Sequence, residues 1–403
     1  MERVTSKTVG RVHTHTHTQG DLSNKENNEN GITLVALVVT IIVLIILAAV
    51  TINILIGNDG IITKAKEAGE GWETAQIDEN KSLEGIFSEM ISASWDMTKV
   101  DKVTSLDGRI VPVPKGYVAS TVEEETNAAT GFVIYEGTTE VNDGNVSTSR
   151  TTRNQYVWVP VPNINDMHEI QGGIKVGKLY DFGTLENPNN PAVLRGYPGL
   201  GAGFREPTAV TGAGGNGDGT GTGVNNDHIS ANLQAAGLSS SATAIDFFEQ
   251  LKNEFDEMIK SVEKYGGFYI GRYETGDLNT DNPIVRKNAL NLSDQTWYVQ
   301  YNKNKKLSNG NDKVRTSMIW GSQWDSTLRW FLTSKDESVR SYITNPAGRA
   351  NYSGTQGGGD AVIPAGSNEA YKVNNIYDMA GNVRDWTLEA TSALSRAFRR
   401  RSI

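Results

Sequence analysis

One uninterrupted apolar stretch limits the fold of this chain more than any other feature. Residues 32 to 56, ITLVALVVTIIVLIILAAVTINILI, carry no charged side chain. At about 1.5 Å per residue they would form a helix of roughly 38 Å, which exceeds a bilayer core of about 30 Å. A secretory signal usually has a shorter apolar core, of about 7 to 15 residues. The sequence therefore predicts a membrane-spanning helix over residues 32–57, with a removed signal as the weaker alternative.

The composition excludes several classes of chemistry. The chain of 403 residues contains no cysteine, so disulfides, thiolate metal sites and cysteine nucleophiles are all absent. Its formal net charge is −9, and no basic footprint for nucleic acid is present. We therefore expect no nucleic-acid partner.

A polar leader, ending ENNENG, runs directly into the apolar stretch. This layout resembles the amino terminus of bacterial type IV prepilins and pseudopilins. The resemblance implies that a prepilin peptidase cuts after Gly31 and that Ile32 becomes a methylated first residue. The helix would then lie in the membrane or pack with pilus or pseudopilus subunits. The family's usual fifth mature residue is Glu, and Ala36 stands there instead, which favours anchoring over polymerisation.

Glycines at 57 and 60 end the apolar pattern, and an amphipathic pattern with charged residues follows. After about residue 105 the sequence changes to short β-type runs. We therefore predict a leader over 1–31, the membrane helix over 32–57, a stalk helix over 58–98 and an outer domain over 105–403.

The outer domain contains short strand-like runs and two clear helical patterns. The expected strands lie in GRIVPVPKGYVAS, TGFVIYEG, NQYVWVPVP and GGFYIGRYETG. The first helix has a capping box at Thr243 and Asp246 and a stop at Gly266, and the second has Ser322 and Asp325 at capping-box spacing. Few helices among many short strands and long loops predict an α+β class. The residues expected to be buried on the helices are Phe248, Leu251, Phe255, Met258 and Val262, then Trp324, Leu328 and Phe331.

Near the carboxy terminus, the run NNIYDMAGNVRDWTLEA resembles the N-x-x-GNVWEW signature of the formylglycine-generating enzyme and sulfatase-modifying-factor family. The resemblance continues backward through YVWVPV, GGFYIGRYE and SQWDSTLRW, in the family's order, and implies a C-type-lectin-like fold. Active members bind copper and oxidise a substrate with a pair of cysteines, which this chain lacks. The chain also ends where the family's R-V-x-R-G-G-S strand begins, so we expect a truncated domain, no copper and no enzyme activity.

The same resemblance implies a calcium site. The matching positions are Asp378, Gly381, Val383 and Asp385, which would supply two carboxylates and two carbonyl oxygens. Oxygen ligands of this kind suit a hard cation. The alternative is a solvated turn with capping carboxylates. Asp385 replaces the family's usual Glu, and Arg384 replaces its usual Trp.

Non-catalytic relatives of this family use the fold to display binding loops, among them the hypervariable receptors of diversity-generating retroelements. We therefore expect a surface-displayed ligand-binding protein with one pass through the cytoplasmic membrane and its outer domain on the cell surface. Its extracellular ligand and ligand-binding residues are not specified by the sequence. The alternative is a minor pilin or pseudopilin subunit of a type IV pilus or type II secretion system.

Overall fold

The computed structural model describes the chain in several segments. These are residues 39–45, 47, 64, 66, 85–181, 193–194, 206–207, 227–277, 282–290, 295–334, 336–344, 351, 362–383, 385–392 and 395–399. The chain divides into two compact units, Met1–Gln76 and Ile77–Ile403. All elements discussed below belong to the second unit.

The predicted membrane helix requires correction. Among the described residues, no helix combines the length and the apolar character needed to cross a membrane. Within the predicted range the longest described run is helical over 39–45, and it rises only about 10 Å. Three predictions are therefore wrong: the fold class with a long amino-terminal membrane helix, the transmembrane and prepilin character, and the single pass through the membrane with an outer domain on the cell surface. The leader, the rest of 32–57 and most of the predicted stalk helix lie outside the described residues.

The second unit is built around an antiparallel sheet of four strands in the order β10-β5-β4-β3. Its strands are β3 (Tyr117–Ala119), β4 (Val133–Glu136), β5 (Gln155–Pro160) and β10 (Gly267–Gly271). All four coincide with strand-like runs recognised in the sequence.

Both faces of the sheet are buried. Successive side chains of a strand point to opposite faces, so Val157 and Val159 of β5 join one apolar cluster, while Tyr156 and Trp158 join the other. The first cluster also contains the buried faces of the long helices, and the second contains strand β2. This double burial explains why β5 is apolar on both sides.

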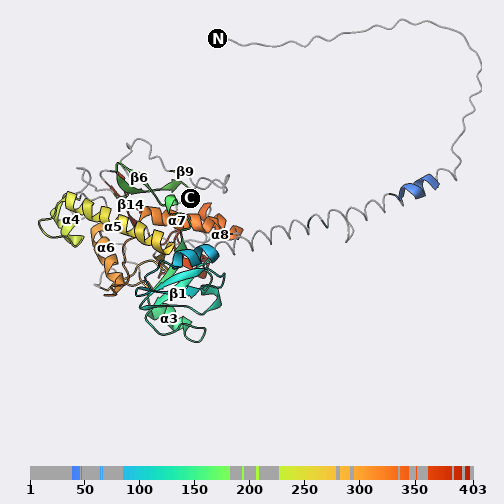
Figure 1. Cartoon of the computed structure of the whole chain (residues 1–403), viewed down its shortest axis with the longest axis horizontal. Helices are drawn as coiled ribbons and strands as arrows, with labels where there is room; N and C mark the ends of the chain where they lie inside the picture. The colour runs from blue at the N-terminus through green and yellow to red at the C-terminus, as the bar shows by residue number, and fades with distance from the viewer. Residues whose placement is uncertain are drawn as a thin grey trace, which may run out of the picture. The chain divides into compact units, whose positions relative to one another are not determined.

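The longest helix is α5 (Ala244–Tyr265), and it forms as its sequence predicts. Thr243 and Asp246 make a reciprocal capping box, and Gly266 ends the helix in the left-handed conformation at φ 80°. The predicted stripe is right at Leu251, Phe255 and Val262, but the structure buries Phe247 and Ile259 in place of Phe248 and Met258. Figure 1 shows α5 in yellow, with the orange helix α7 nearby; the rings of Phe255 and Trp320 meet edge to face at 5.0 Å.

Helix α7 (Gly321–Leu332) begins differently from the prediction. Trp324, Leu328 and Phe331 are buried as expected. The predicted capping box of Ser322 and Asp325 does not form, because both residues already lie inside the helix. Asp325 instead accepts a hydrogen bond from the backbone N–H of Tyr180, at 2.8 Å.

The first N–H groups of α7 are bound by a distant glutamate. The N–H groups of Gly321 and Ser322 donate to the carboxylate of Glu206, at 2.7 and 2.5 Å. A carboxylate at a helix amino terminus accepts hydrogen bonds from backbone N–H groups that have no partner within the helix, and its charge interacts favourably with the helix dipole. Burial, and next the charge of buried Glu389, raise the pKa of Glu206 to about 8.

The remaining elements are short. The other strands pair as two-stranded antiparallel sheets: β1 (Val100–Thr104) with β2 (Ile110–Pro114), β6 (His168–Gln171) with β7 (Ile174–Gly177), β8 (Tyr180–Asp181) with β9 (Val193–Leu194), β11 (Lys372–Val373) with β12 (Ile376–Tyr377), and β13 (Asp385–Ser392) with β14 (Ser395–Arg399). Further helices are α3 (Val146–Thr152), α4 (Ser230–Ala235), α6 (Trp297–Asn304) and α8 (Glu337–Thr344), with 3-10 turns η1 (Glu123–Glu125), η2 (Ile164–Asp166), η3 (Lys305–Ser308) and η4 (Glu369–Tyr371). Residues 85–92, within the predicted stalk helix, are also helical.

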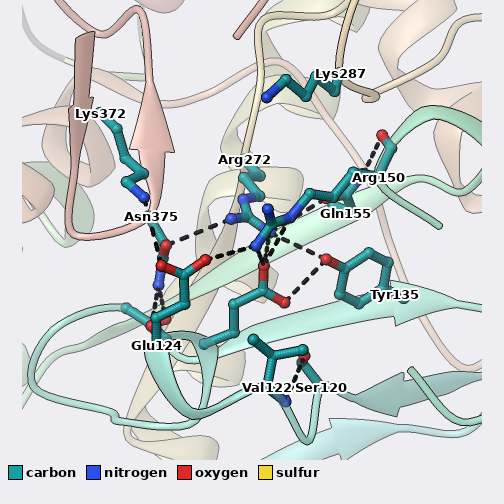
Figure 2. A network of polar contacts seen from close by, with 12 residues as sticks. Ser120, Val122, Glu124, Tyr135, Arg150, Gln155, Arg272, Lys287, Lys372 and Asn375 are labelled. Carbon is teal, nitrogen blue, oxygen red and sulfur yellow. Dashed lines mark hydrogen bonds and ion pairs between the residues drawn. The ribbon is translucent and has the colours of Figure 1, made fainter. Parts of the chain in front are cut away.

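A buried ion pair connects the sheet to the carboxy-terminal segment. Arg272, directly after β10, and Glu125 of η1 are both fully buried, and their Nη1 and Oε1 atoms are 2.6 Å apart. Arg150 donates to the same oxygen at 2.6 Å, and the hydroxyl of Tyr135 donates to the other oxygen at 2.9 Å. Figure 2 shows these side chains converging from separate elements.

The network continues from Arg272 to the loop before β12. Arg272 Nη2 donates to Asn375 Oδ1 at 3.4 Å, and Asn375 Nδ2 donates to the carbonyl oxygens of Glu124 and Gly131 at 2.7 and 2.8 Å. The backbone N–H of Tyr377 donates to the Arg272 carbonyl at 2.9 Å. Residues 375–377 are therefore held against the edge of the sheet.

We predict that Glu125→Gln destabilises the protein by about 3–5 kcal/mol, since removal of one partner leaves the buried Arg272 charge uncompensated. Chemical denaturation at neutral pH measures this. The matched control is Glu124→Gln, because Glu124 pairs with the same Arg150 but its side chain is 53% exposed. The control should cost about 0–1 kcal/mol. Equal losses in the two variants would contradict the role of the buried pair.

The loss of stability in Glu125→Gln should depend on pH. Burial opposes the charge of Glu125, but Arg272 and Arg150 outweigh it and hold the pKa of this carboxyl below its ordinary value. A lowered folded-state pKa contributes stability above the unfolded pKa of about 4.5 and loses it as pH falls through the folded value. The stability difference between wild type and Glu125→Gln should therefore shrink in acid below about pH 4.5.

Glu206 should make the stability of the protein change with pH in the opposite direction. Because its folded pKa is raised to about 8, the folded state binds its proton more tightly than the unfolded chain, and stability falls as pH rises from about 4.5 to 8. The change Glu389→Gln removes the neighbouring charge and should flatten this part of a melting-temperature profile. An unchanged slope would contradict the coupling of the two glutamates.

Candidate functional site

The second unit contains a large cavity of about 1750 Å³. Strands β5 and β10, the end of α5, the start of α7 and the segment from Ile376 to Trp386 all contribute to its wall. The cavity reaches the surface, because the exposed residues Asp312, Arg315 and Ser317 also line it. Its aromatic lining comprises Tyr117, Tyr156, Trp158, Tyr265, Phe268, Tyr269, Tyr273, Trp320, Trp324, Tyr377 and Trp386.

Six carboxylate residues line the cavity, and three of them, Glu274, Asp378 and Asp385, come from the segments that follow β10 and β12. Glu274 follows β10 by three residues, Asp378 directly follows β12, and Asp385 begins β13. The network around Arg272 explains why two of these segments lie together: Arg272 is two residues before Glu274, and it binds the backbone of Tyr377, next to Asp378.

Glu274 organises the turn that leads to β13. Its Oε2 atom accepts a hydrogen bond from Asn382 Nδ2 at 2.6 Å, and its Oε1 atom accepts from the N–H of Val383 at 3.2 Å. Burial, and next the charges of Asp385 and Asp378, raise its pKa well above the ordinary value. The sequence analysis did not single out Glu274, although it lies in the recognised run GGFYIGRYETG. Its role depends on a turn more than 100 residues later, which no local pattern indicates.

Asp378 is 1% exposed, and its two carboxylate oxygens differ in their hydrogen bonding. Its Oδ2 atom accepts from the N–H of Gly366 at 2.7 Å, whereas its Oδ1 atom is buried without a hydrogen-bond partner among the described residues. Burial raises the pKa of Asp378 to about 6. For Asp385, burial and then the charge of Asp378 raise the pKa above its ordinary value.

Tyr273, another residue that lines the cavity, has a second unsatisfied group. Its side chain is 3% exposed, and its hydroxyl finds no hydrogen-bond partner in the part of the chain that the structure describes. Its ring stacks on Tyr377 with centroids 4.9 Å apart. Gly366 lies so close that an added Cβ would be 2.2 Å from the Tyr273 ring, and its φ is +65°. A glycine is therefore needed beside both Tyr273 and Asp378.

The structure brings together only part of the predicted calcium set. Asp378, Val383 and Asp385 line one cavity, but Gly381 is not in its wall. Gly381 instead forms a bridge with Asn351, whose carbonyl oxygen would be 2.8 Å from an added Cβ. The predicted processing residues, Gly31 and Ile32, lie outside the described residues.

The described residues do not fit calcium as they stand. Calcium takes six to eight oxygen ligands, and among the described residues no group of three or more His, Asp or Glu side chains is placed to hold a metal ion. The N–H of Val383 is directed to Glu274. Calcium therefore stays a prediction from the resemblance.

Comparison with protein families, curated proteins and solved structures finds no match to this chain. The resemblances given in the sequence analysis therefore rest on their motifs alone. The function has to be argued from the cavity and its side chains.

The calcium prediction has a direct check. If calcium binds the folded state, it stabilises the protein by about 2.7 kcal/mol at one hundred times the dissociation constant, so a chelator should lower the melting temperature. The double variant Asp378→Asn with Asp385→Asn should remove this sensitivity, and Asp312→Asn, another acid of the same cavity, should keep it. A wild-type melting curve that neither chelator nor millimolar calcium moves would eliminate the site.

Proposed function

We propose that residues 105–403 form a non-catalytic ligand-binding domain and that the ligand occupies the cavity between the sheet and the carboxy-terminal segment. The observation that carries the proposal is the cavity itself, about 1750 Å³ in volume and lined by aromatic side chains. Binding sites for small molecules are concave, mostly apolar and supplied with a few polar groups that fix orientation. Asp378 and Tyr273 would be such groups.

The construction of the cavity supports ligand binding. Its walls come largely from strands, from helices and from a turn fixed by Glu274, and sites held by rigid elements keep their geometry. Pockets for drug-sized ligands measure about 300–1,000 Å³, so this volume suits a larger ligand or one segment of a polymer. The absence of cysteine removes the copper-dependent oxidation that active members of the resembled family perform. The four motifs resemble that family as a whole, and because the family includes non-catalytic members that display binding loops, the resemblance is compatible with this proposal.

We predict that ligands found by a thermal-shift screen of metabolites and oligosaccharides lose their effect in a variant with an obstructed cavity. Ser317→Trp is suitable, because Ser317 is an exposed lining residue and a large ring there would narrow the entrance without disturbing the core. The control is Thr138→Trp, which adds the same ring at an exposed loop position away from the cavity.

Binding that survives Ser317→Trp, in a variant with an unchanged circular dichroism spectrum, would place the ligand elsewhere and overturn the proposal. Loss of binding in both tryptophan variants would show only a general effect of the added ring, and would also count against it.

A further inference from the structure

The acidic part of the cavity wall has a charge that the described ion pairs do not balance. No ion pair joins Asp378 or Asp385 to a lysine or arginine within the described ranges. Several basic side chains line the same cavity, but they have their own partners: Lys305 pairs with Glu254, Lys313 with Asp312, and Arg315 with Glu257.

Two buried polar atoms at this end of the cavity have unused hydrogen-bonding capacity. They are the Oδ1 atom of Asp378 and the hydroxyl oxygen of Tyr273, and each belongs to a side chain that is at least nine-tenths buried. Both side chains are held in place, Asp378 by the N–H of Gly366 and Tyr273 by stacking on Tyr377. A buried acceptor without a donor destabilises the protein, and a ligand that donates a hydrogen bond there would offset this cost.

Aromatic rings lie next to these acceptors. Tyr273, Tyr377 and Trp386 line the cavity together with the three carboxylates. Aromatic faces attract cations and also provide apolar contact area. The rings of Tyr273 and Tyr377 already take part in such contacts, because the guanidinium carbon of Arg272 lies 5.7 and 5.8 Å from their centroids.

We propose that the end of the cavity formed by Glu274, Asp378, Asp385 and Tyr273 binds the ammonium or guanidinium group of an organic ligand. This inference rests on the proposed ligand-binding function and specifies the chemical class of the ligand. The cationic group donates to Asp378 Oδ1 and to the Tyr273 oxygen, and the apolar body of the ligand lies along the aromatic wall. A cavity of about 1750 Å³ with aromatic walls accommodates such a body. A bare metal ion has no apolar body and would not use these walls.

The source of the cation is either a free amine or a basic side chain of a peptide, and both present the same group. Isothermal titration calorimetry on the full chain, with a chelator present, distinguishes them with three probes. Phenethylamine is the free amine, phenethyl alcohol is its neutral isostere, and Nα-acetyl-argininamide represents a peptide side chain. A separate titration with calcium chloride, without chelator, tests the metal.

The expected result is that at least one cationic probe binds and that phenethyl alcohol binds at least about tenfold more weakly than phenethylamine. Asp378→Asn should weaken the cationic probe by about tenfold or more, since charge-assisted hydrogen bonds contribute about 1.5–3 kcal/mol. The alcohol donates only a neutral hydrogen bond, so its binding should weaken much less. The control Asp312→Asn removes a charge from the same cavity at an exposed, paired position and should have no effect.

A second variant protects the test against misfolding of Asp378→Asn. Tyr273→Phe removes one hydroxyl that has no partner in the described structure, so the fold should be retained. It should weaken the cationic probe severalfold and the alcohol much less. If Asp378→Asn is unfolded by circular dichroism, Tyr273→Phe decides.

Three outcomes would overturn the inference: equal affinities for the amine and the alcohol, cation binding unaffected by both variants, or binding of calcium with none of the cationic probes. The first of these, if Ser317→Trp abolishes the binding, would leave the proposed ligand-binding function intact. If no ligand of any charge binds in the cavity, that function fails as well.

Discussion

The buried ion pair between Arg272 and Glu125 is the interaction on which the rest of the second unit depends. Burying two charges is costly unless they gain hydrogen bonds, and here Tyr135, Gln155, Arg150 and Asn375 supply several of them. Among the described residues, Arg272 Nε has no partner. The four partners come from two strands, a helix and the carboxy-terminal segment (Figure 2). Segments separated by up to about 250 residues are thereby fixed to one edge of the sheet.

This arrangement also determines the candidate site. Arg272 is followed by Tyr273 and Glu274, and its carbonyl oxygen holds Tyr377, which is followed by Asp378. The side chains that follow Arg272 and those that follow Tyr377 therefore line the same cavity. Burial disfavours the charged forms of Glu274, Asp378 and Asp385 and so raises their pKa values. A bound cation would favour the charged forms and offset this cost.

Local patterns predicted the elements better than their boundaries and faces. Helix α5 has its capping box, its glycine stop and most of its buried stripe where the sequence placed them, because all these signals act within one or two turns. Helix α7 begins one residue earlier than its predicted cap, since its first N–H groups are bound by Glu206, more than 100 residues away. The membrane helix was predicted from hydropathy alone and is corrected by the absence of a long apolar helix among the described residues.

The sequence by itself determined the strands of the sheet, the existence of both long helices and the exclusion of cysteine chemistry, because alternation, helical spacing and composition are local properties. It also indicated Asp378 and Asp385 as a related pair. Only the tertiary structure decided that Glu274 joins them, that Gly381 is not among the cavity-lining residues, and that Tyr273 and Asp378, which line the cavity, each have a buried polar atom without a hydrogen-bond partner among the described residues. Those facts depend on contacts between residues far apart in the chain, and burial and unpaired hydrogen-bonding groups exist only once these contacts have formed.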